Sequence, residues 1–168
     1  MSALIVTAEL GKEDFAWLDA QRRRYFPPER NQLPAHLTMF HALPPSVEDE
    51  LRRELASHAA GPPPRALLAG LMNLGRGVAY RVVTEELELI RREIGARFHG
   101  LLSAQDNQGW RPHVTIMNKA EPAAAKALLR ELERGFEPRP LAVMGLALHR
   151  YLGGPWEPLG SWSFRGVR

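Results

Sequence analysis

A His-x-Thr motif occurs twice in the chain, and this repetition constrains the fold more than any other feature of the sequence. The first copy, His36 and Thr38, lies in PAHLTMFHAL (34–43), and the second, His113 and Thr115, lies in RPHVTIMNKA (111–120). Both runs are apolar, contain a proline just before the motif and are rich in residues that favour strands. Since residues i and i+2 of a strand point to the same face, roughly 6.5–7 Å apart, each motif is expected to present an imidazole beside a hydroxyl.

The hydrophobic patterns around the motifs predict the same order of elements in each half of the chain. In each half a strand, a helix, the motif strand, a second helix and another strand follow one another. In the first half we expect these at 3–9, 12–25, 36–43, 46–58 and 65–74, with Ser46 as the N-cap of the second helix. In the second half we expect strands at 77–84, 113–119 and 140–151. One helix is expected to follow the N-cap Thr84, and another is expected to begin at Pro122. A final edge strand or hairpin arm is expected at 156–166.

This order predicts an α+β fold in a single bilobal domain, residues 1–168, with approximate lobes 1–76 and 77–168 whose strands can exchange. Each duplicated βαβαβ-type lobe is expected to hold an antiparallel sheet with two helices outside it. Two copies of one unit tend to pack about a local two-fold axis, so that equivalent strands face each other. We therefore expect both motifs to line one central cleft.

Two imidazoles and two hydroxyls in one cleft meet the needs of phosphodiester hydrolysis without a metal. One neutral histidine takes a proton from water, and one protonated histidine gives a proton to the leaving alkoxide oxygen. Histidine suits both roles because its pKa of about 6.5 lies near neutral pH. The threonine hydroxyls can donate hydrogen bonds to the phosphoryl oxygens, where negative charge collects.

Composition excludes several other classes of site. The chain has 168 residues, 45% of them hydrophobic, and no cysteine, which excludes disulfides, thiolate metal sites and a cysteine nucleophile. No run of roughly 18 apolar residues that could cross a membrane is present, and the N-terminus lacks the pattern of a secretory signal. A cytoplasmic monomer without a cofactor or metal is expected. The net charge of +3 weakly favours an anionic partner.

Tandem His-x-Thr motifs in two such halves resemble the two-histidine (2H) phosphoesterase superfamily, which includes the 2′-5′ RNA ligase-like proteins and the RNA 2′,3′-cyclic phosphodiesterases. The segment HRYLGGPWEPLGSWSF (149–164) also resembles the closing hairpin of a bacterial branch of that family. The resemblance implies a basic cleft, no metal, and action on 2′,3′-cyclic phosphates or 2′-5′ linkages of RNA ends or small nucleotides. It also implies that His36 and His113 are catalytic, with His113 the base and His36 the acid, and that Thr38 and Thr115 hold the phosphate.

The remaining histidines are weaker candidates. Strand alternation places His41 on the face opposite His36, which predicts a packed or surface role. His58 and His99 fall in late helical turns and are not expected to be catalytic. His149, in the last long strand, can face the cleft, although a packed position is the simpler expectation.

Other side chains could contribute to substrate binding. Lys119 lies six residues after His113, so that alternation would put it on the motif face. Arg81 and Arg150 lie on other expected strands, and Tyr151 and Trp156, beside a glycine turn, could stack on a base. The arginine clusters at 22–24 and 91–92 are expected to be solvated helix faces, with steering of a polyanion as the functional alternative.

The sequence leaves an alternative function open, namely a non-catalytic RNA- or nucleotide-binding protein that uses the same cleft. Ligation is the reverse of the hydrolytic chemistry and would use the same residues. The residues themselves do not identify the physiological substrate or the direction of the reaction.

Overall fold

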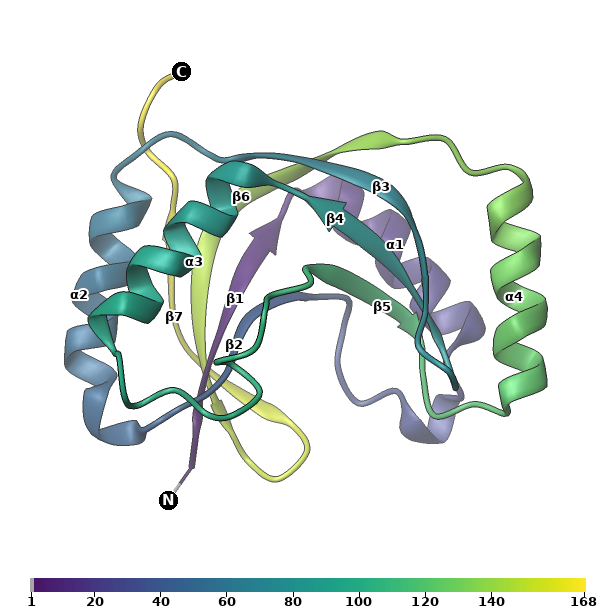
Figure 1. The fold of residues 1–168 in the computed structure, drawn as a ribbon, viewed down its shortest axis with the longest axis horizontal. Coiled ribbons are helices and arrows are strands. Elements are labelled where there is room, and N and C mark those ends of the chain that lie inside the picture. Colours follow the sequence, from purple (N-terminus) through teal and green to yellow (C-terminus); the bar gives the residue numbers. More distant parts are fainter. Residues whose placement is uncertain (1) are drawn as a thin grey trace.

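The computed structural model describes residues 2–168, and within them the chain forms four α-helices, two short 3₁₀ turns and seven strands (Figure 1). The first half contains β1 (Leu4–Leu10), α1 (Lys12–Tyr25), η1 (Pro28–Arg30), β2 (Leu37–Leu43), η2 (Pro45–Val47), α2 (Glu48–Ala59) and β3 (Arg65–Asn73). The second half contains β4 (Val78–Val83), α3 (Glu85–Arg97), β5 (His113–Met117), α4 (Pro122–Arg134), β6 (Arg139–Tyr151) and β7 (Trp156–Ser163). The expected order of elements and the α+β class are confirmed.

The strands form one antiparallel sheet in the order β2-β1-β6-β3-β4-β5, and β7 pairs with β6 beside this path. The long strand β6 connects the two parts of the sheet, because its first residues pair with β3 while its later residues pair with β1 and β7. The two halves of the chain are thereby interleaved: β3 pairs with β4, and the end of β6 lies beside β1. The proposed lobe boundary at residue 76 stays a prediction.

The four helices lie on two sides of the molecule, and each side holds one helix from each half of the chain. In Figure 1, α2 and α3 lie together on one side of the molecule, and α1 and α4 lie on the other. Helix α2 contacts β6 and β7, whereas α1 contacts β5, the motif strand of the other half of the chain. Buried side chains from all of these layers form a continuous core that includes Leu4, Leu18, Leu51, Leu68, Leu87 and Val114.

One helix cap agrees with the expectation and one does not. The hydroxyl of Thr84 accepts a hydrogen bond from the backbone N–H of Leu87, as expected for the N-cap of α3. The prediction of Ser46 as an N-cap is wrong, because a 3₁₀ turn begins at Pro45 and α2 starts at Glu48 with Val47 at its N-cap. Proline has a backbone φ suited to the first position of a helical turn, so the turn begins before Ser46. Among the helices of residues 2–168, none is long and apolar enough to cross a membrane.

Candidate active site

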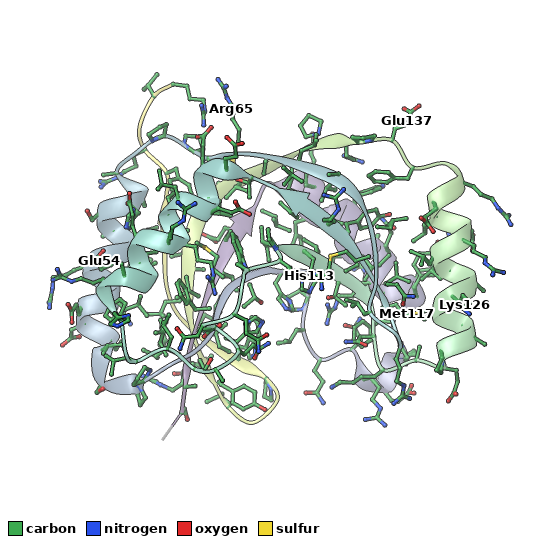
Figure 2. The ribbon with its side chains drawn as sticks, viewed as in Figure 1. Glu54, Arg65, His113, Met117, Lys126 and Glu137 are labelled. Carbon is green, nitrogen blue, oxygen red and sulfur yellow. The ribbon has the colours of Figure 1, made fainter. Side chains whose placement is uncertain are left out.

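The two motifs lie at opposite ends of the strand order and nevertheless meet. Strands β2 and β5 are the outermost strands of the path, but one hollow of about 310 Å³ is lined by His36, Thr38, His113 and Thr115 together. Figure 2 shows His113 near the middle of the molecule, between the two helix pairs. The structure therefore brings the four motif side chains, which come from distant parts of the sequence, to one surface.

Both motif histidines are anchored to the backbone in the same way. The Nδ1 atom of His36 donates to the carbonyl oxygen of Pro34 at 2.8 Å, and that of His113 donates to the carbonyl oxygen of Arg111 at 2.7 Å. Because a carbonyl oxygen only accepts, the hydrogen of each neutral ring must be on Nδ1. Each Nε2 is left as a proton acceptor when the ring is neutral and as a donor when the ring is charged.

Three adjoining hollows meet at His36 and Trp156, which line all of them, and together we call these hollows the groove. The hollow that contains both motifs is the His41 hollow, after a further residue in its lining. The second, the Lys119 hollow, has a volume of about 310 Å³ and includes Thr115 and Lys119. The third, the apolar hollow, has a volume of about 400 Å³. The motif residues therefore lie where surfaces of different chemistry join.

The environment of His36 disfavours the charged ring. Burial is the main cause and lowers its pKa from 6.5 to about 4, although the hydrogen bond to Pro34 opposes this. Positive charge on Arg22, His149 and His113 lowers the pKa further. The ring also packs edge-on against Trp156, with the ring centroids 4.8 Å apart. His36 is therefore neutral at neutral pH in the empty groove.

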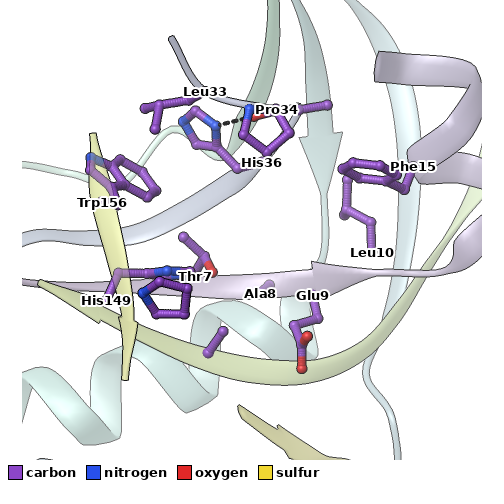
Figure 3. Close-up of a pocket in the computed structure, with 13 residues that line it drawn as sticks. Thr7, Ala8, Glu9, Leu10, Phe15, Leu33, Pro34, His36, His149 and Trp156 are labelled. Atoms are coloured by element: carbon purple, nitrogen blue, oxygen red, sulfur yellow. Dashed lines mark hydrogen bonds between the residues drawn. The ribbon is translucent and has the colours of Figure 1, made fainter. Parts of the chain in front are cut away.

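The apolar hollow contains another histidine. Figure 3 shows Trp156 at one end of this hollow, Phe15 toward the other, and His149 across from His36. The Nε2 atom of His149 lies 3.0 Å from the hydroxyl of Thr7, and its ring packs against Trp156 with the centroids 5.3 Å apart. Burial lowers the pKa of His149, an effect that the charge of Glu9 opposes. His149 therefore lines the groove, whereas a packed position was the simpler expectation.

The prediction that His41 faces away from His36 is wrong, because both side chains line the same hollow. One step along β1, from Val6 to Thr7, corresponds to two steps along β2, from Phe40 to Thr38, so Met39 is an extra residue in the ladder. Such a bulge reverses the alternation of the residues that follow it. Met39 and Phe40 are consequently both buried, and His41 lines the groove with 41% of its side chain exposed.

The expectation that both arginine clusters are solvated is wrong for one member of each. Arg22 is only 4% exposed, and it donates to the carbonyl oxygen of Thr115 at 3.0 Å. Arg91 donates to the carbonyl oxygen of Met39 at 2.7 Å. Burial lowers the pKa of both guanidinium groups. Each arginine thus extends from a helix of one half of the chain to the motif strand of the other half.

Of the other side chains expected to bind substrate, some lie on the groove and some do not. Lys119 lies beyond the end of β5, in the left-handed backbone region with φ 59°, and lines the Lys119 hollow with Tyr151 and Trp156. Arg81 lines a separate hollow with Arg111 and lies opposite His113 in the β4–β5 ladder. Arg150 lines none of the three hollows, because it binds the carboxylates of Glu48 and Glu157.

Within residues 2–168, no three His, Cys, Asp or Glu side chains lie together in a cluster that could hold a metal ion. The groove instead carries imidazoles, hydroxyls, amides and guanidinium groups, which are suited to proton transfer and to binding an anion.

Comparison with known proteins identifies the family. A family model described as the 2′-5′ RNA ligase superfamily matches residues 11–155. The chain belongs to this superfamily. The resemblance to 2H phosphoesterases is thereby confirmed, and phosphoesterase chemistry is the general activity to which this membership points. No curated protein gives a significant sequence match.

Solved structures with the same fold cover nearly the whole chain. TT0787 of Thermus thermophilus is 20% identical over 100% of both chains, with a TM-score of 0.67. Escherichia coli LigT complexed with NADP⁺ and LigT complexed with 3′-AMP are each 20% identical, covering 97% of this chain and 98% of theirs, with a TM-score of 0.60. At this level of identity the likeness establishes the fold alone.

Proposed function

We propose that the protein is a metal-independent phosphodiesterase that hydrolyses a 2′,3′-cyclic phosphate or a 2′-5′ phosphodiester of RNA or a small nucleotide. The observation that carries this proposal is the matched pair of anchored imidazoles. His36 and His113 each donate Nδ1–H to the carbonyl oxygen two residues earlier, and both line the hollow that contains Thr38 and Thr115. Two equivalent proton-transfer groups beside two hydroxyls form a set suited to in-line attack on phosphorus.

In the proposed mechanism water attacks the phosphorus directly and no covalent enzyme intermediate forms. Nε2 of one histidine accepts the proton of the water, and Nε2–H of the other protonates the oxygen that leaves. Family resemblance favours His113 as the base and His36 as the acid. Because the pKa of His36 is about 4 in the empty groove, this assignment requires the ring to gain a proton when the anionic phosphodiester binds.

The hydroxyls of Thr38 and Thr115 are placed to bind the phosphate. Both threonines line the same hollow, and Trp110 and Arg22 donate to their backbone carbonyl oxygens rather than to their hydroxyls. A hydroxyl that is not engaged within the protein can turn its hydrogen toward a phosphoryl oxygen. Trp156 and the apolar hollow offer a surface on which a nucleobase can pack, and the LigT structures with 3′-AMP and NADP⁺ support a nucleotide as the ligand class.

Separate substitutions of the two histidines test the proposal. His36→Ala and His113→Ala are each expected to lower kcat for a 2′,3′-cyclic nucleotide by at least roughly a hundredfold, while nucleotide binding is largely kept. His99→Ala, on an exposed histidine away from the groove, is the matched control and should keep wild-type turnover. Products from a panel of cyclic nucleotides and 2′-5′ dinucleotides would be identified by chromatography.

Two results would contradict the proposal. Turnover that is lost on treatment with EDTA would mean that the two histidines do not suffice. A wild-type protein that binds the nucleotides but converts none of them would be a nucleotide-binding protein that uses the same groove. Formation of a 2′-5′ linkage from the cyclic nucleotides of the same panel would instead assign the reverse direction of the reaction to these residues.

A further inference from the structure

A third oriented imidazole lies in the groove beside the two of the motifs. The bulge at Met39 brings His41 to the face of β2 that carries His36 and Thr38, and His41 lines the same hollow as His113. Bulges next to active sites commonly redirect a side chain in this way. The proposed acid–base pair does not use His41, so its position calls for a separate explanation.

The ring of His41 is held by a buried carboxylate. Asp106, which is 2% exposed, accepts from Nδ1 of His41 at 3.1 Å and from the backbone N–H groups of His41 and Ala42. These hydrogen bonds outweigh the opposing effect of burial and lower the pKa of Asp106. Because Asp106 is therefore ionised, the hydrogen on Nδ1 is fixed and Nε2 is the ring nitrogen available to a ligand.

The surroundings of His41 favour an anion. The lining of this hollow includes Arg91 and Arg111 together with the amides of Gln105 and Gln108, and it includes no carboxylate. Asp106, the acid that holds His41, is covered and already accepts several hydrogen bonds. The guanidinium of Arg91 is packed over Phe40 and Trp110, with its carbon 4.7 Å and 5.4 Å from the two ring centroids, so its charge is fixed at this position.

We propose that His41, oriented by Asp106, binds a second phosphoryl group of the substrate in this hollow, next to the phosphodiester that is cleaved. The inference rests on the proposed function and narrows its substrate class to nucleotides that carry two phosphates. The second phosphate is either a terminal 5′-phosphate or the next phosphodiester of an RNA chain. Its oxygens accept from Arg111 at the rim and from Nε2–H of His41, whose ring carries both of its hydrogens in this complex.

Three substrates separate these sources: adenosine 2′,3′-cyclic phosphate, its 5′-phosphorylated form, and the dinucleotide ApA ending in a 2′,3′-cyclic phosphate. For the wild-type protein we expect kcat/KM to be about ten- to a hundredfold higher for one or both of the two-phosphate substrates, the range for a hydrogen bond between charged groups. His41→Gln should bring this ratio close to one, mainly through KM. Arg111→Gln should also lower the ratio, because it removes the guanidinium group at the rim. This substitution keeps the backbone carbonyl that anchors His113.

The design separates binding from folding. His41→Gln keeps the two backbone hydrogen bonds to Asp106, so the loop at 101–112 should stay in place, and urea unfolding checks that it does. His99→Gln is the matched control and should leave the ratio unchanged. If Lys119→Gln removes the preference and His41→Gln does not, the second phosphate lies in the Lys119 hollow and the inference is wrong.

Failure of this inference can be told apart from failure of the proposed function. If the wild-type protein hydrolyses all three substrates with equal kcat/KM, the phosphodiesterase stands and the His41 subsite is refuted. If it hydrolyses none of them and no 2′-5′ dinucleotide either, the proposed function fails, and calorimetric titration with 3′-AMP and with adenosine 3′,5′-bisphosphate decides the inference alone. Tighter binding of the bisphosphate that His41→Gln abolishes would support the subsite, and equal binding would overturn it.

Discussion

The imidazole of His36 should titrate far below the ordinary range of histidine. Burial against Trp156 and its neighbours lowers the pKa from 6.5 to about 4, and this change corresponds to about 3 kcal/mol against the charged ring at about 1.36 kcal/mol per pH unit. The unfolded chain takes up this proton at a higher pH than the folded chain does. The free energy of unfolding therefore falls as the pH drops from 6.5 toward 4, and the stabilisation by the neutral ring is fully present above 6.5.

Two measurements check this value. The chemical shifts of the His36 ring, followed by NMR against pH, should give a midpoint near 4. Urea unfolding of the wild-type protein and His36→Asn, at about pH 7.5 and about pH 3.5, should show that the difference in unfolding free energy between the two proteins changes by about 3 kcal/mol. The wild-type protein becomes relatively less stable at the lower pH, since only its folded state must accept the buried charge.

Substitution of the covering ring tests the cause of the shift. Trp156→Ala removes the aromatic ring that packs edge-on against His36 and should raise the pKa of His36 toward 6.5. Tyr151→Ala, an exposed aromatic on the same hairpin, should leave that pKa near its wild-type value. A wild-type midpoint at or above about 6, or a Trp156→Ala midpoint still near 4, would refute burial as the dominant cause.

Two further predictions concern the roles of the groove residues. The pH dependence of kcat/KM follows the pKa values of the free enzyme. An acid role for His36 therefore predicts that kcat/KM declines as the pH rises above about 4, whereas a base role predicts that kcat/KM declines below about 4. A pH–rate profile on a 2′,3′-cyclic nucleotide distinguishes the two roles. Arg22→Met removes the hydrogen bonds to Asn31 and to the carbonyl oxygen of Thr115 and should lower the free energy of unfolding by about 1–3 kcal/mol in urea, with Arg23→Met, on an exposed neighbour, as the control.

The features that the sequence predicts well are those that local patterns determine. The repeated motif identified β2, which begins just after His36, and β5, which begins at His113, and each threonine lines the same hollow as its histidine. Hydrophobic periodicity located the helices and strands to within a few residues. Thr84 was recognisable as a cap because a hydroxyl residue stood immediately before an acidic first turn.

The features that were missed depend on contacts between distant segments. His41 was assigned to the wrong face because a bulge depends on the pairing of β2 with β1, which the local sequence does not reveal. Arg22 belongs to a run of three arginines, and only the packing of α1 on β5 distinguishes the buried one from its exposed neighbours. Arg150 was expected near the groove, but its strand position could not reveal that Glu48 of α2 would bind it.

The same long-range contacts determine how far apart the two motifs lie. Among residues 2–168, β2 and β5 do not pair with each other, so strand hydrogen bonds do not set the distance between them. Side chains connect them instead: Arg91 of α3 donates to Met39, Trp110 donates to Thr38 at 3.1 Å, and Arg22 of α1 donates to Thr115. All three hydrogen bonds end on backbone carbonyl oxygens of the motif strands. A substitution in α1 or α3 can therefore change the distance between the two imidazoles without altering a motif residue. The two short motifs alone are thus not sufficient to form the site.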